Sequence, residues 1–322
     1  MGFGGYSHEA HAAISRARAD LPQQQIFTQK KCHPLMDPRG VKQRESRDSP
    51  AHPRSLAVVF ALDVTGSMGE IPVTLAKKEL PAFMQSILDL GVADPQVLFM
   101  AVGDARSDRA PLQVGQFESA AAEMDQWLTR SFLEGGGGEY GQESYELALY
   151  FAARHTDVDC ARKRGKRGYF FMTGDERPYP RVSRSEVEKL IDDGLDEDLA
   201  LDAVVRELSE TYHPFFLIPD EARRARCERP WRDLMGDHVV CMGSPSDTCL
   251  VAAALIAITE GADVATVVER MKSAGVDGAR VGAVVRAVTP YASTLGRDSA
   301  ASPALTDAAL PRGDGESRHK RP

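Results

Sequence analysis

The sequence lacks the features that mark disulfide-stabilised, secreted or membrane-spanning proteins. Its five cysteines are odd in number, widely spaced and without a CxxC pair, so neither a disulfide framework nor a zinc site is predicted. The longest unbroken apolar run, residues 249–258, is about half as long as a membrane-spanning helix must be. The N-terminus, MGFGGYSHEAHAAIS, contains no apolar segment typical of a secretory signal. These absences predict a cytoplasmic protein without a membrane anchor.

The chain also lacks an excess of positive charge. Lys and Arg number 39 against 47 Asp and Glu, a formal net charge of −8, so the protein as a whole is not built to bind nucleic acid. A local exception is the basic run at 162–167, which is either a solvated loop or a contact for an acidic partner or nucleic acid. With 322 residues, 43% of them hydrophobic and 27% charged, the composition is that of a globular protein with one large or two small domains.

What the sequence does contain is a series of short apolar runs separated by helical patterns. The runs at 56–62, 97–102, 169–172, 215–218 and 239–242 predict buried strands, and 112–114 predicts a short edge strand. Apolar residues recur at helical spacing between them. This alternation predicts a doubly wound α/β fold, with a mostly parallel sheet and helices on both faces. In such sheets ligands bind at the carboxyl ends of the strands, so functional residues are expected directly after the apolar runs.

The two ends of the chain differ in composition from the middle. Residues 1–54 have few apolar clusters and contain four prolines after position 30, which predicts an irregular N-terminal arm that lies on the domain or binds a partner. The domain itself is expected over 55–261. Two amphipathic stretches predict C-terminal helices packed on or beside it within 262–289. Residues 290–322, rich in Pro, Ser, Gly and charge, are predicted to be a disordered tail.

A polar loop follows the first strand and reads Asp63-Val-Thr65-Gly-Ser67. One carboxylate and two hydroxyls stand at alternate positions, so a turn can direct all three oxygens at one point. Hard oxygens that converge in this way favour Mg²⁺, with Mn²⁺ or Ca²⁺ as alternatives. A strand-ending Asp followed by Ser or Thr can also simply cap the next helix. The loops after the other strands therefore decide between these two interpretations.

Two further loops carry carboxylates at the same edge of the predicted sheet. The glycine-rich loop 134–144 contains Glu139, Glu143 and Ser144 and leads directly into a helix. Its glycines permit a backbone path that other residues cannot follow. The third loop, which ends the strand at 169–172, places Asp175 after Thr173-Gly174. Three oxygen-rich loops at three strand ends favour a ligand site over simple helix capping.

Together these loops resemble the metal-ion-dependent adhesion site, or MIDAS, of von Willebrand factor A domains. Asp63-x-Thr65-x-Ser67 is similar to the family's D-x-[ST]-x-S signature. The glycine-rich loop before the E-x-x-x-x-A-L segment at 143–149 resembles the GGGD-x-P-E loop of intracellular members. Asp175 falls where the family has an aspartate after its fourth strand. The resemblance covers roughly residues 55–261.

The sequence departs from the family pattern in two of the three loops. The second loop is one residue longer, and Tyr140 stands near the expected Asp, so the choice among Glu139, Glu143 and Ser144 as a ligand stays open. The third loop reads Thr-Gly-Asp instead of Thr-Asp-Gly, which displaces Asp175 by one residue. A degenerate site that keeps the fold and binds no metal is therefore an alternative.

The resemblance implies a bacterial, intracellular protein that binds other proteins and catalyses no reaction. Its implied metal ligands are drawn from Asp63, Thr65, Ser67, Asp175, Glu139 and Glu143. A carboxylate of the partner fills the open coordination position, so that Mg²⁺, Mn²⁺ or Ca²⁺ joins the two proteins. Intracellular relatives commonly act as adaptors, often beside AAA+ ATPases of the MoxR type or within stress and defence systems. The resemblance implies no membrane or nucleic-acid partner.

A rival interpretation is a Mg²⁺-dependent phosphotransferase or phosphatase of the haloacid dehalogenase type. Asp63-Val-Thr-Gly-Ser is similar to the D-K-T-G-T motif of P-type ATPases, and Thr173-Gly174-Asp175 is similar to their T-G-D. Asp63 is then a nucleophile that forms an aspartyl phosphate. However, Thr65 stands where the phosphatase branch has its general acid, and the only Gly-Asp-Gly lies at 313–315, within the predicted tail. The adaptor hypothesis is therefore favoured.

Overall fold

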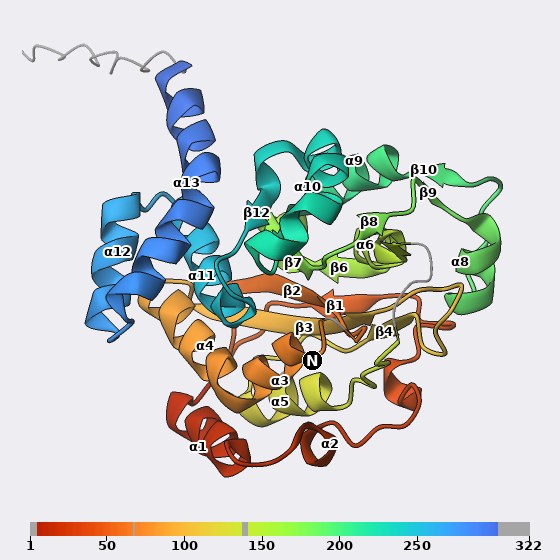
Figure 1. The fold of residues 1–322 in the computed structure, drawn as a ribbon, viewed down its shortest axis with the longest axis horizontal. Helices are drawn as coiled ribbons and strands as arrows, with labels where there is room; N and C mark the ends of the chain where they lie inside the picture. The colour runs from red at the N-terminus through yellow and green to blue at the C-terminus, as the bar shows by residue number, and fades with distance from the viewer. Residues whose placement is uncertain (1–4, 67, 137–140, 302–322) are drawn as a thin grey trace, which may run out of the picture.

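A six-stranded sheet forms the centre of the protein (Figure 1). The computed structural model describes residues 5–66, 68–136 and 141–301, with 297–301 described by their backbone only. The sheet order is β12-β11-β7-β2-β3-β4. Its strands are β2 (Ser55–Asp63), β3 (Asp94–Val102), β4 (Leu112–Val114), β7 (Gly168–Thr173), β11 (Tyr212–Ile218) and β12 (Val239–Cys241). All adjacent pairs are parallel except β3 and β4.

Helices cover both faces of this sheet, which confirms the predicted doubly wound α/β fold. In Figure 1, α6, α9 and α10 lie on one side of the sheet, and α3, α4 and α5 lie on the other. These helices and their neighbours are α3 (Glu70–Thr74), the π-helical turn η2 (Leu75–Glu79), α4 (Leu80–Asp89), α5 (Ala121–Thr129), α6 (Tyr145–Arg154), α7 (Asp159–Arg164), α8 (Arg184–Leu190), α9 (Leu201–Thr211), α10 (Glu221–Met235) and α11 (Thr248–Thr259).

The central strands are buried along their whole length because both faces are covered. Every residue of β2 and of β7 is buried, as expected for continuous apolar runs. Phe60 lies in the middle of β2. Its ring centroid is 5.1 Å from that of Phe83 in α4 and 5.5 Å from that of Phe171 in β7. The core thus joins the two halves of the sheet at β2.

The strand order of the sheet changes direction at β2. From β2 it continues to β3 and β4 on one side, whereas β7, β11 and β12 follow on the other side. Counted in chain order, the six strands therefore run 6-5-4-1-2-3. The carboxyl ends of β2 and β7 form the topological switch point, the place where open α/β sheets bind ligands. Asp63 ends β2, and Asp175 follows β7 by two residues.

Short elements connect the main strands and helices, and serine side chains cap the starts of two of them. Ser183 Oγ accepts a hydrogen bond from the Glu186 backbone N–H at 3.5 Å and begins α8. Ser244 caps the turn that precedes α11, a helix buried along nearly its entire length. The remaining short elements are α2 (Gln23–Ile26), η1 (Pro34–Met36), β1 (Arg44–Ser46), β5 (Gln142–Glu143), β6 (Thr156–Val158), β8 (Arg177–Pro178), β9 (Arg181–Val182), β10 (Leu199–Ala200), η3 (Gly236–His238) and η4 (Pro245–Asp247).

The N-terminal arm contains more regular structure than the irregular segment that its composition predicts. Helix α1 (His8–Arg18) packs against η2, α4 and α5, and β1 pairs in parallel with β6. The buried side chains of α1 are His11 and Ser15, and Ser15 Oγ donates to the Ala76 carbonyl at 3.2 Å. Because polar side chains face the domain, the helix carries no apolar stripe that sequence reasoning could detect. The predicted boundary at residue 54 stays a prediction.

We expect a docked arm to resist proteolysis and a single arginine to control that resistance. Arg18 makes a two-pronged ion pair with Asp125 of α5, whose side chain is only 7% exposed. Arg18→Ala leaves this carboxylate buried without its partner, so cleavage within the arm should be several-fold faster, as followed by mass spectrometry of limited digests. Arg16→Ala, on the exposed side of α1, is the matched control. Equal cleavage rates in the two variants contradict the docking role of Arg18.

The C-terminal helices are α12 (Val264–Ser273) and α13 (Gly278–Ala301). Helix α13 continues beyond residue 289 and contains Pro290, so the predicted disordered tail begins within a helix. The reason is packing: Tyr291 is 3% exposed, its ring lies edge-on to Phe215 with centroids 4.9 Å apart, and its hydroxyl lies 3.0 Å from that of Thr259. Burial of this ring outweighs the hydrogen bond that proline removes. The rest of the predicted tail, 302–322, lies outside the described residues.

No helix within the described parts of the chain is both long enough and apolar enough to cross a lipid bilayer.

Candidate functional site

The centre of the candidate site is Asp63, the last residue of β2. Its carboxylate is buried, and its Oδ1 accepts hydrogen bonds from the Thr65 backbone N–H at 2.9 Å and from the Thr65 hydroxyl at 2.6 Å. The turn after β2 thus folds Thr65 back onto the carboxylate two residues earlier. The oxygens of the two side chains lie together, as the alternating motif predicts. Ser67, the third residue of the motif, lies outside the described residues.

Tyr145, the first residue of α6, links the ends of β2 and β7. Its hydroxyl donates to Asp63 Oδ2 at 2.6 Å and accepts from the backbone N–H groups of Asp175 and Glu176, at 3.3 and 3.4 Å. The tyrosine is fully buried, and burial together with the neighbouring carboxylates raises its pKa well above the usual value. It therefore stays a hydrogen-bond donor to Asp63. Sequence reasoning missed this residue because a helix-starting tyrosine reads as a core residue.

Asp175 supplies the second buried carboxylate at the switch point. Within the described residues neither of its oxygens accepts a hydrogen bond, and its side chain is 1% exposed. The nearest positive groups are on α10: Arg223 Nε lies 3.3 Å and Arg226 Nη1 lies 3.9 Å from Asp175 Oδ2. A carboxylate this deeply buried needs a compensating charge, and these arginines approach it without a well-formed hydrogen bond.

The electrostatics of Asp63 indicate that the site is short of positive charge. Burial and, to a smaller extent, the negative charge of Asp175 raise the pKa of Asp63 to about 7, against the lowering effect of the hydrogen bonds from Thr65 and Tyr145. The charge of Asp175 therefore opposes the ionisation of Asp63 at the carboxyl ends of adjacent strands. A cation between them relieves this repulsion and restores the charged form of Asp63.

The predicted site residues of the glycine-rich loop 134–144 do not all lie at the candidate site. Glu143 is 1% exposed, and its charge is one of the influences that raise the pKa of the buried Tyr145. Ser144 faces away: its hydroxyl donates to Asp104 Oδ1 at 3.3 Å and accepts from the Ala105 N–H at 2.9 Å. Glu139 lies outside the described residues, as does Tyr140. The structure therefore keeps Glu143 near the site and assigns Ser144 to a neighbouring cluster.

Glycines let the second loop cross directly over the first. The Gly66 N–H donates to the Gly136 carbonyl at 2.5 Å, and the Gly135 N–H donates to the Val64 carbonyl at 3.4 Å. A Cβ atom at Gly66 would lie 3.2 Å from the carbonyl oxygens of both Gly135 and Gly136, so a side chain there forces the loops apart. These three glycines are exposed, so the described part of the rim above Asp63 carries no side chain at these positions.

A second acidic cluster lies beside the first and was missed at the sequence level. Asp104, two residues after β3, accepts hydrogen bonds from the hydroxyls of Tyr179 and Ser107, both at 3.1 Å, as well as from Ser144. Glu146 in α6 is fully buried, and neither of its carboxylate oxygens has a hydrogen-bond partner elsewhere in the described residues. The detectable signal was Asp104 itself, since an aspartate follows the second apolar run as it follows the first.

The donor set at the switch point fits a hard divalent cation. Two carboxylates, Asp63 and Asp175, and the Thr65 hydroxyl are oxygen ligands of the kind that Mg²⁺ prefers. Within the described residues no group of three or more His, Cys, Asp or Glu side chains is arranged to hold a metal ion. A cation here therefore requires the hydroxyls of the motif beside the two carboxylates, as in the MIDAS pattern that the sequence resembles.

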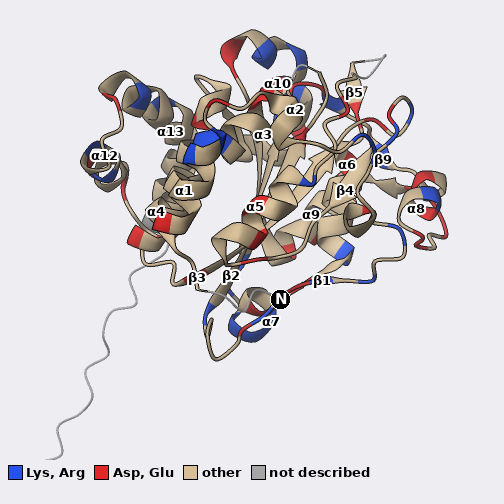
Figure 2. Ribbon diagram, turned by 90° about the horizontal axis from the view of Figure 1, so that it is seen from below, with Lys and Arg blue, Asp and Glu red and all other residues tan. Residues whose placement is uncertain are grey.

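The basic run at 162–167 is engaged in local pairs. Figure 2 shows basic and acidic residues side by side around α7. The pairs are Arg162 with Asp157 and Asp159 (3.1 and 2.6 Å), Lys163 with Asp159 (2.6 Å), Arg164 with Asp48, and Lys166 with Glu260 (2.7 Å). Acidic partners of the same chain thus meet most of this charge, which favours a structural role for the run.

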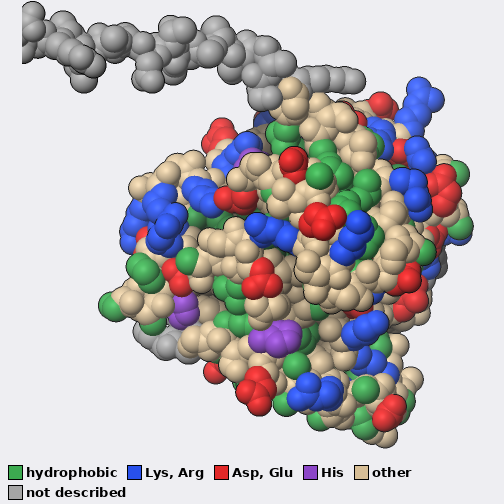
Figure 3. Space-filling model, turned by 90° about the vertical axis from the view of Figure 1, so that its left-hand side faces the viewer, with side chains coloured by type: hydrophobic (Ala, Val, Ile, Leu, Met, Phe, Trp, Pro, Cys, Tyr) green, Lys and Arg blue, Asp and Glu red, His purple; other side chains and the backbone are tan. Residues whose placement is uncertain are grey.

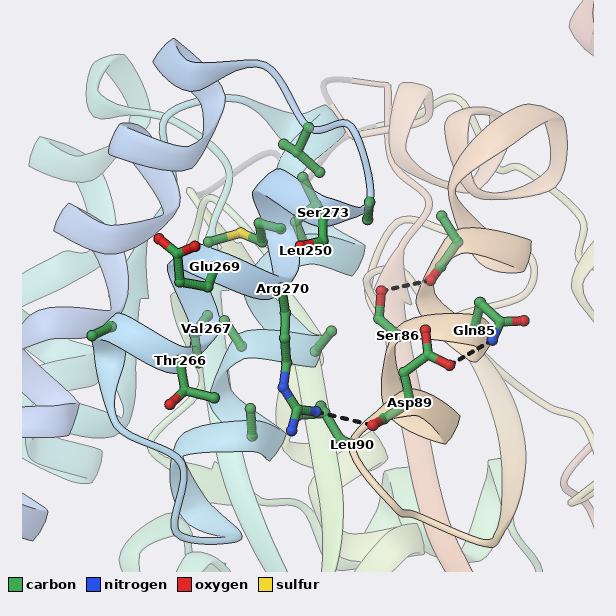
Figure 4. A pocket seen from close by; sticks show the side chains of 18 of the residues that line it. Gln85, Ser86, Asp89, Leu90, Leu250, Thr266, Val267, Glu269, Arg270 and Ser273 are labelled. Carbon is green, nitrogen blue, oxygen red and sulfur yellow. Dashed lines mark hydrogen bonds between the residues drawn. The ribbon is translucent and has the colours of Figure 1, made fainter.

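A large groove lies away from the candidate site, between α4, α11 and α12 (Figure 4). Its volume is about 940 Å³, and its lining includes Leu90, Leu250, Val267 and Met271. Arg270 crosses its edge and donates to the Asp89 carbonyl at 3.0 Å, where a cation suits the end of α4. On the face drawn in Figure 3, apolar side chains are interspersed with charged ones. None of the described residues of the candidate site lines this groove.

No protein-family model matches the chain, and no curated protein sequence matches it either. Solved structures that are similar to it include a von Willebrand factor type A protein from Catenulispora acidiphila, with 14% identity, a TM-score of 0.41, and coverage of 65% of this chain and 43% of that chain. Proximal thread matrix protein 1 from the mussel byssus is 10% identical with a TM-score of 0.40, covering 67% and 49%. The pilus adhesin SpaC from Lactobacillus rhamnosus GG, in an open conformation, is 11% identical with a TM-score of 0.41, covering 69% and 31%. The chain thus spans at most about half the length of these proteins.

Proposed function

We propose that the protein binds another protein through a divalent cation held by Asp63, Thr65 and Asp175. The observation that carries this proposal is the meeting of two buried carboxylates and a hydroxyl at the topological switch point, with too little positive charge to compensate them. Mg²⁺ is the preferred ion, with Mn²⁺ or Ca²⁺ as alternatives. The ion supplies an open coordination position, and an acidic side chain of the partner fills it.

The shape of the rim supports an approach by a partner's side chain. Gly66, Gly135 and Gly136 are exposed above the buried carboxylates, so a carboxylate can reach toward the ion between backbone segments. The Thr65 hydroxyl donates to Asp63 and keeps its lone pairs available to a cation. A site with few charged ligands leaves the ion electron-poor, which strengthens its attraction for an incoming anion. An AAA+ ATPase of the MoxR type, in a bacterial stress or defence system, is the class of partner that the sequence resemblance suggests.

The surroundings of Asp63 favour binding over phosphoryl transfer. Both of its carboxylate oxygens already accept hydrogen bonds, Oδ1 from Thr65 and Oδ2 from Tyr145. A nucleophilic aspartate needs one oxygen directed at the phosphorus atom, and hydroxyl donors lower its nucleophilicity. Thr65, which stands where a phosphatase has its general acid, donates to Asp63. We therefore propose an adaptor without phosphatase or ATPase activity.

Affinity capture with the purified protein as bait tests this function. A specific partner should be retained in Mg²⁺ and lost in chelator, and it should be lost equally with Asp63→Ala or with Thr65→Ala plus Ser67→Ala. Lys163→Ala, in the paired basic run, is the control that should retain the partner. A partner that survives both chelator and Asp63→Ala contradicts the metal-bridged mechanism.

A phosphatase and ATPase assay separates the adaptor from its rival. We expect no Mg²⁺-dependent release of phosphate from a generic phosphate ester or from ATP. Asp63→Asn is the decisive variant, because an aspartyl-phosphate mechanism requires the ionised carboxylate as its nucleophile. Phosphate release by the wild-type protein that disappears in Asp63→Asn overturns the adaptor proposal.

A further inference from the structure

Helix α10 covers the Asp175 side of the candidate site and contacts it at three points. Trp231 Nε1 donates to the Glu176 carbonyl at 3.1 Å. Arg223 Nε lies 3.3 Å from Asp175 Oδ2, and Arg226 Nη1 lies 3.6 Å from Glu176 Oε1. One helix therefore holds the loop after β7 through a hydrogen bond in its middle and two guanidinium groups near its start. Whatever changes the charge on this loop acts directly on α10.

Arg223 is the guanidinium closest to the buried carboxylate of Asp175. Its side chain is 20% exposed, and its Nη1 is held by Asp220, the N-cap of α10, at 2.7 Å. Arg226 is farther from Asp175, at 3.9 Å, and its side chain is 58% exposed. Exposed charges are screened by water, whereas partly buried ones are screened much less. Of the two α10 arginines that approach Asp175, Arg223 thus acts on it more strongly.

A guanidinium in this position has opposite effects on the two states of the site. Without a metal ion it compensates Asp175, so it stabilises the two adjacent carboxylates. With a divalent cation bound to Asp63 and Asp175, the same group is a third positive charge beside the ion, and like charges repel. The Arg223–Asp175 pair must then weaken, because Asp175 shares its negative charge with the metal.

We propose that Arg223 is a tethered cation that competes with the divalent ion for Asp175 and so couples occupancy of the site to the position of α10. This inference rests on the cation site of the proposed function. It assigns Arg223 as a positioning residue that lowers metal affinity, and it assigns the start of α10 as the element that responds when metal binds.

The structure supplies a matched control on the same helix. Arg224 follows Arg223 directly, but its guanidinium contacts Glu221 and Glu228 and does not reach Asp175. Removing Arg224 changes the net charge of α10 by the same amount as removing Arg223. Any difference between the two variants therefore reports the contact with Asp175 and not the overall charge of the helix.

The test combines metal affinity with fluorescence from α10. The chain contains two tryptophans, so Trp127→Phe leaves only Trp231, which stacks on Phe216 with ring centroids 3.9 Å apart. In this background Mg²⁺ and Mn²⁺ are titrated by calorimetry and by Trp231 emission. Arg223→Gln should bind metal about tenfold more tightly and should show a smaller metal-induced change in emission. Arg224→Gln should match the parent in both readouts. Arg223→Lys keeps the positive charge on a shorter side chain. Its metal affinity and its change in emission should lie between those of the parent and of Arg223→Gln.

The outcomes separate this inference from the function on which it rests. If the parent binds neither ion, the cation site itself is wrong and the role of Arg223 is overturned with it. If the parent binds metal but Arg223→Gln leaves affinity and emission unchanged, only the role of Arg223 is overturned. Weaker binding in Arg223→Gln also overturns it, because it shows that Arg223 supports the ion. If Arg223→Gln does not fold, tighter binding by Arg223→Lys than by the parent supports the competition, and equal binding overturns it.

Discussion

Mg²⁺ is expected to raise the melting temperature of the wild-type protein, and Asp63→Asn should abolish that response. A ligand that binds only the folded state stabilises it by about 2.7 kcal/mol at a concentration one hundred times its Kd. For a protein of 322 residues, whose entropy of unfolding is about 2.1 cal/mol/K per residue, such a gain corresponds to roughly 4 °C. The response should vanish in Asp63→Asn because the buried Asp63 carboxylate ends β2 at the centre of the donor set. Scanning calorimetry with and without Mg²⁺ measures both values.

The informative quantity is the difference that the metal makes in each variant. Asp63→Asn removes one of two mutually repelling carboxylates, so its metal-free form can melt above the wild type. Thr65→Ser, which keeps the hydroxyl, should retain the response, whereas Thr65→Val, which has the same shape without a hydroxyl, should reduce it. Equal shifts with Mg²⁺ in the wild type and in Asp63→Asn show that the ion binds elsewhere, and they remove the site assignment.

Glu146→Gln is expected to stabilise the protein at neutral and alkaline pH, although it changes a fully buried residue. Burial raises the pKa of Glu146 well above its usual value, and the charges of Glu186 and Asp104 raise it further, while Arg106 lowers it. Neither of its carboxylate oxygens has a partner elsewhere in the described residues. An ionised, unpaired carboxylate inside a protein is costly. Glutamine keeps the volume of the side chain without the cost of ionisation.

The direction of the pH dependence follows from this raised pKa. The folded state holds the proton on Glu146 at pH values where the unfolded chain has released it. Wild-type stability therefore decreases as pH rises from 4.5, the ordinary pKa of a glutamate side chain, toward the raised pKa of the folded state, by up to about 1.4 kcal/mol per pH unit. Urea unfolding at a series of pH values should show this slope in the wild type and a smaller one in Glu146→Gln. Glu123→Gln, at an exposed position of α5, should show the same slope of unfolding free energy against pH as the wild type. If Glu146→Gln also shows the wild-type slope, the argument for a buried proton on Glu146 is contradicted.

The two acidic clusters share one short segment of chain, so their roles are separable by mutation. Tyr145 donates to Asp63, whereas Ser144 donates to Asp104, whose charge also raises the pKa of Glu146. Alternate residues before and at the start of α6 thus point to opposite sides. We expect changes on one side to alter the response to metal and changes on the other to alter the pH dependence of stability.

Local patterns in the sequence were sufficient to predict the fold class. Continuous apolar runs predicted β2, β3, β7, β11 and β12, because a strand buried on both faces must be apolar throughout. The edge strand β4 was also predicted at its observed bounds. Alternation of these runs with helical patterns led to the parallel, doubly wound sheet, and the sheet rule placed Asp63 and Asp175 at one edge. These inferences depend on short-range periodicity, which the chain carries residue by residue.

Only the tertiary structure decided which polar groups meet. Tyr145, Arg223 and Glu146 are separated in sequence from the residues they affect, and their types are common in cores and on surfaces, so no local pattern distinguishes them. The same holds for the buried Ser15 of α1, whose hydroxyl donates to the Ala76 carbonyl of the domain and not to its own helix. A periodic apolar face can be recognised in the sequence because burial selects an apolar residue at each position separately. A hydrogen bond or a compensating charge requires two groups brought together by the fold, and that pairing exists only once the chain has folded.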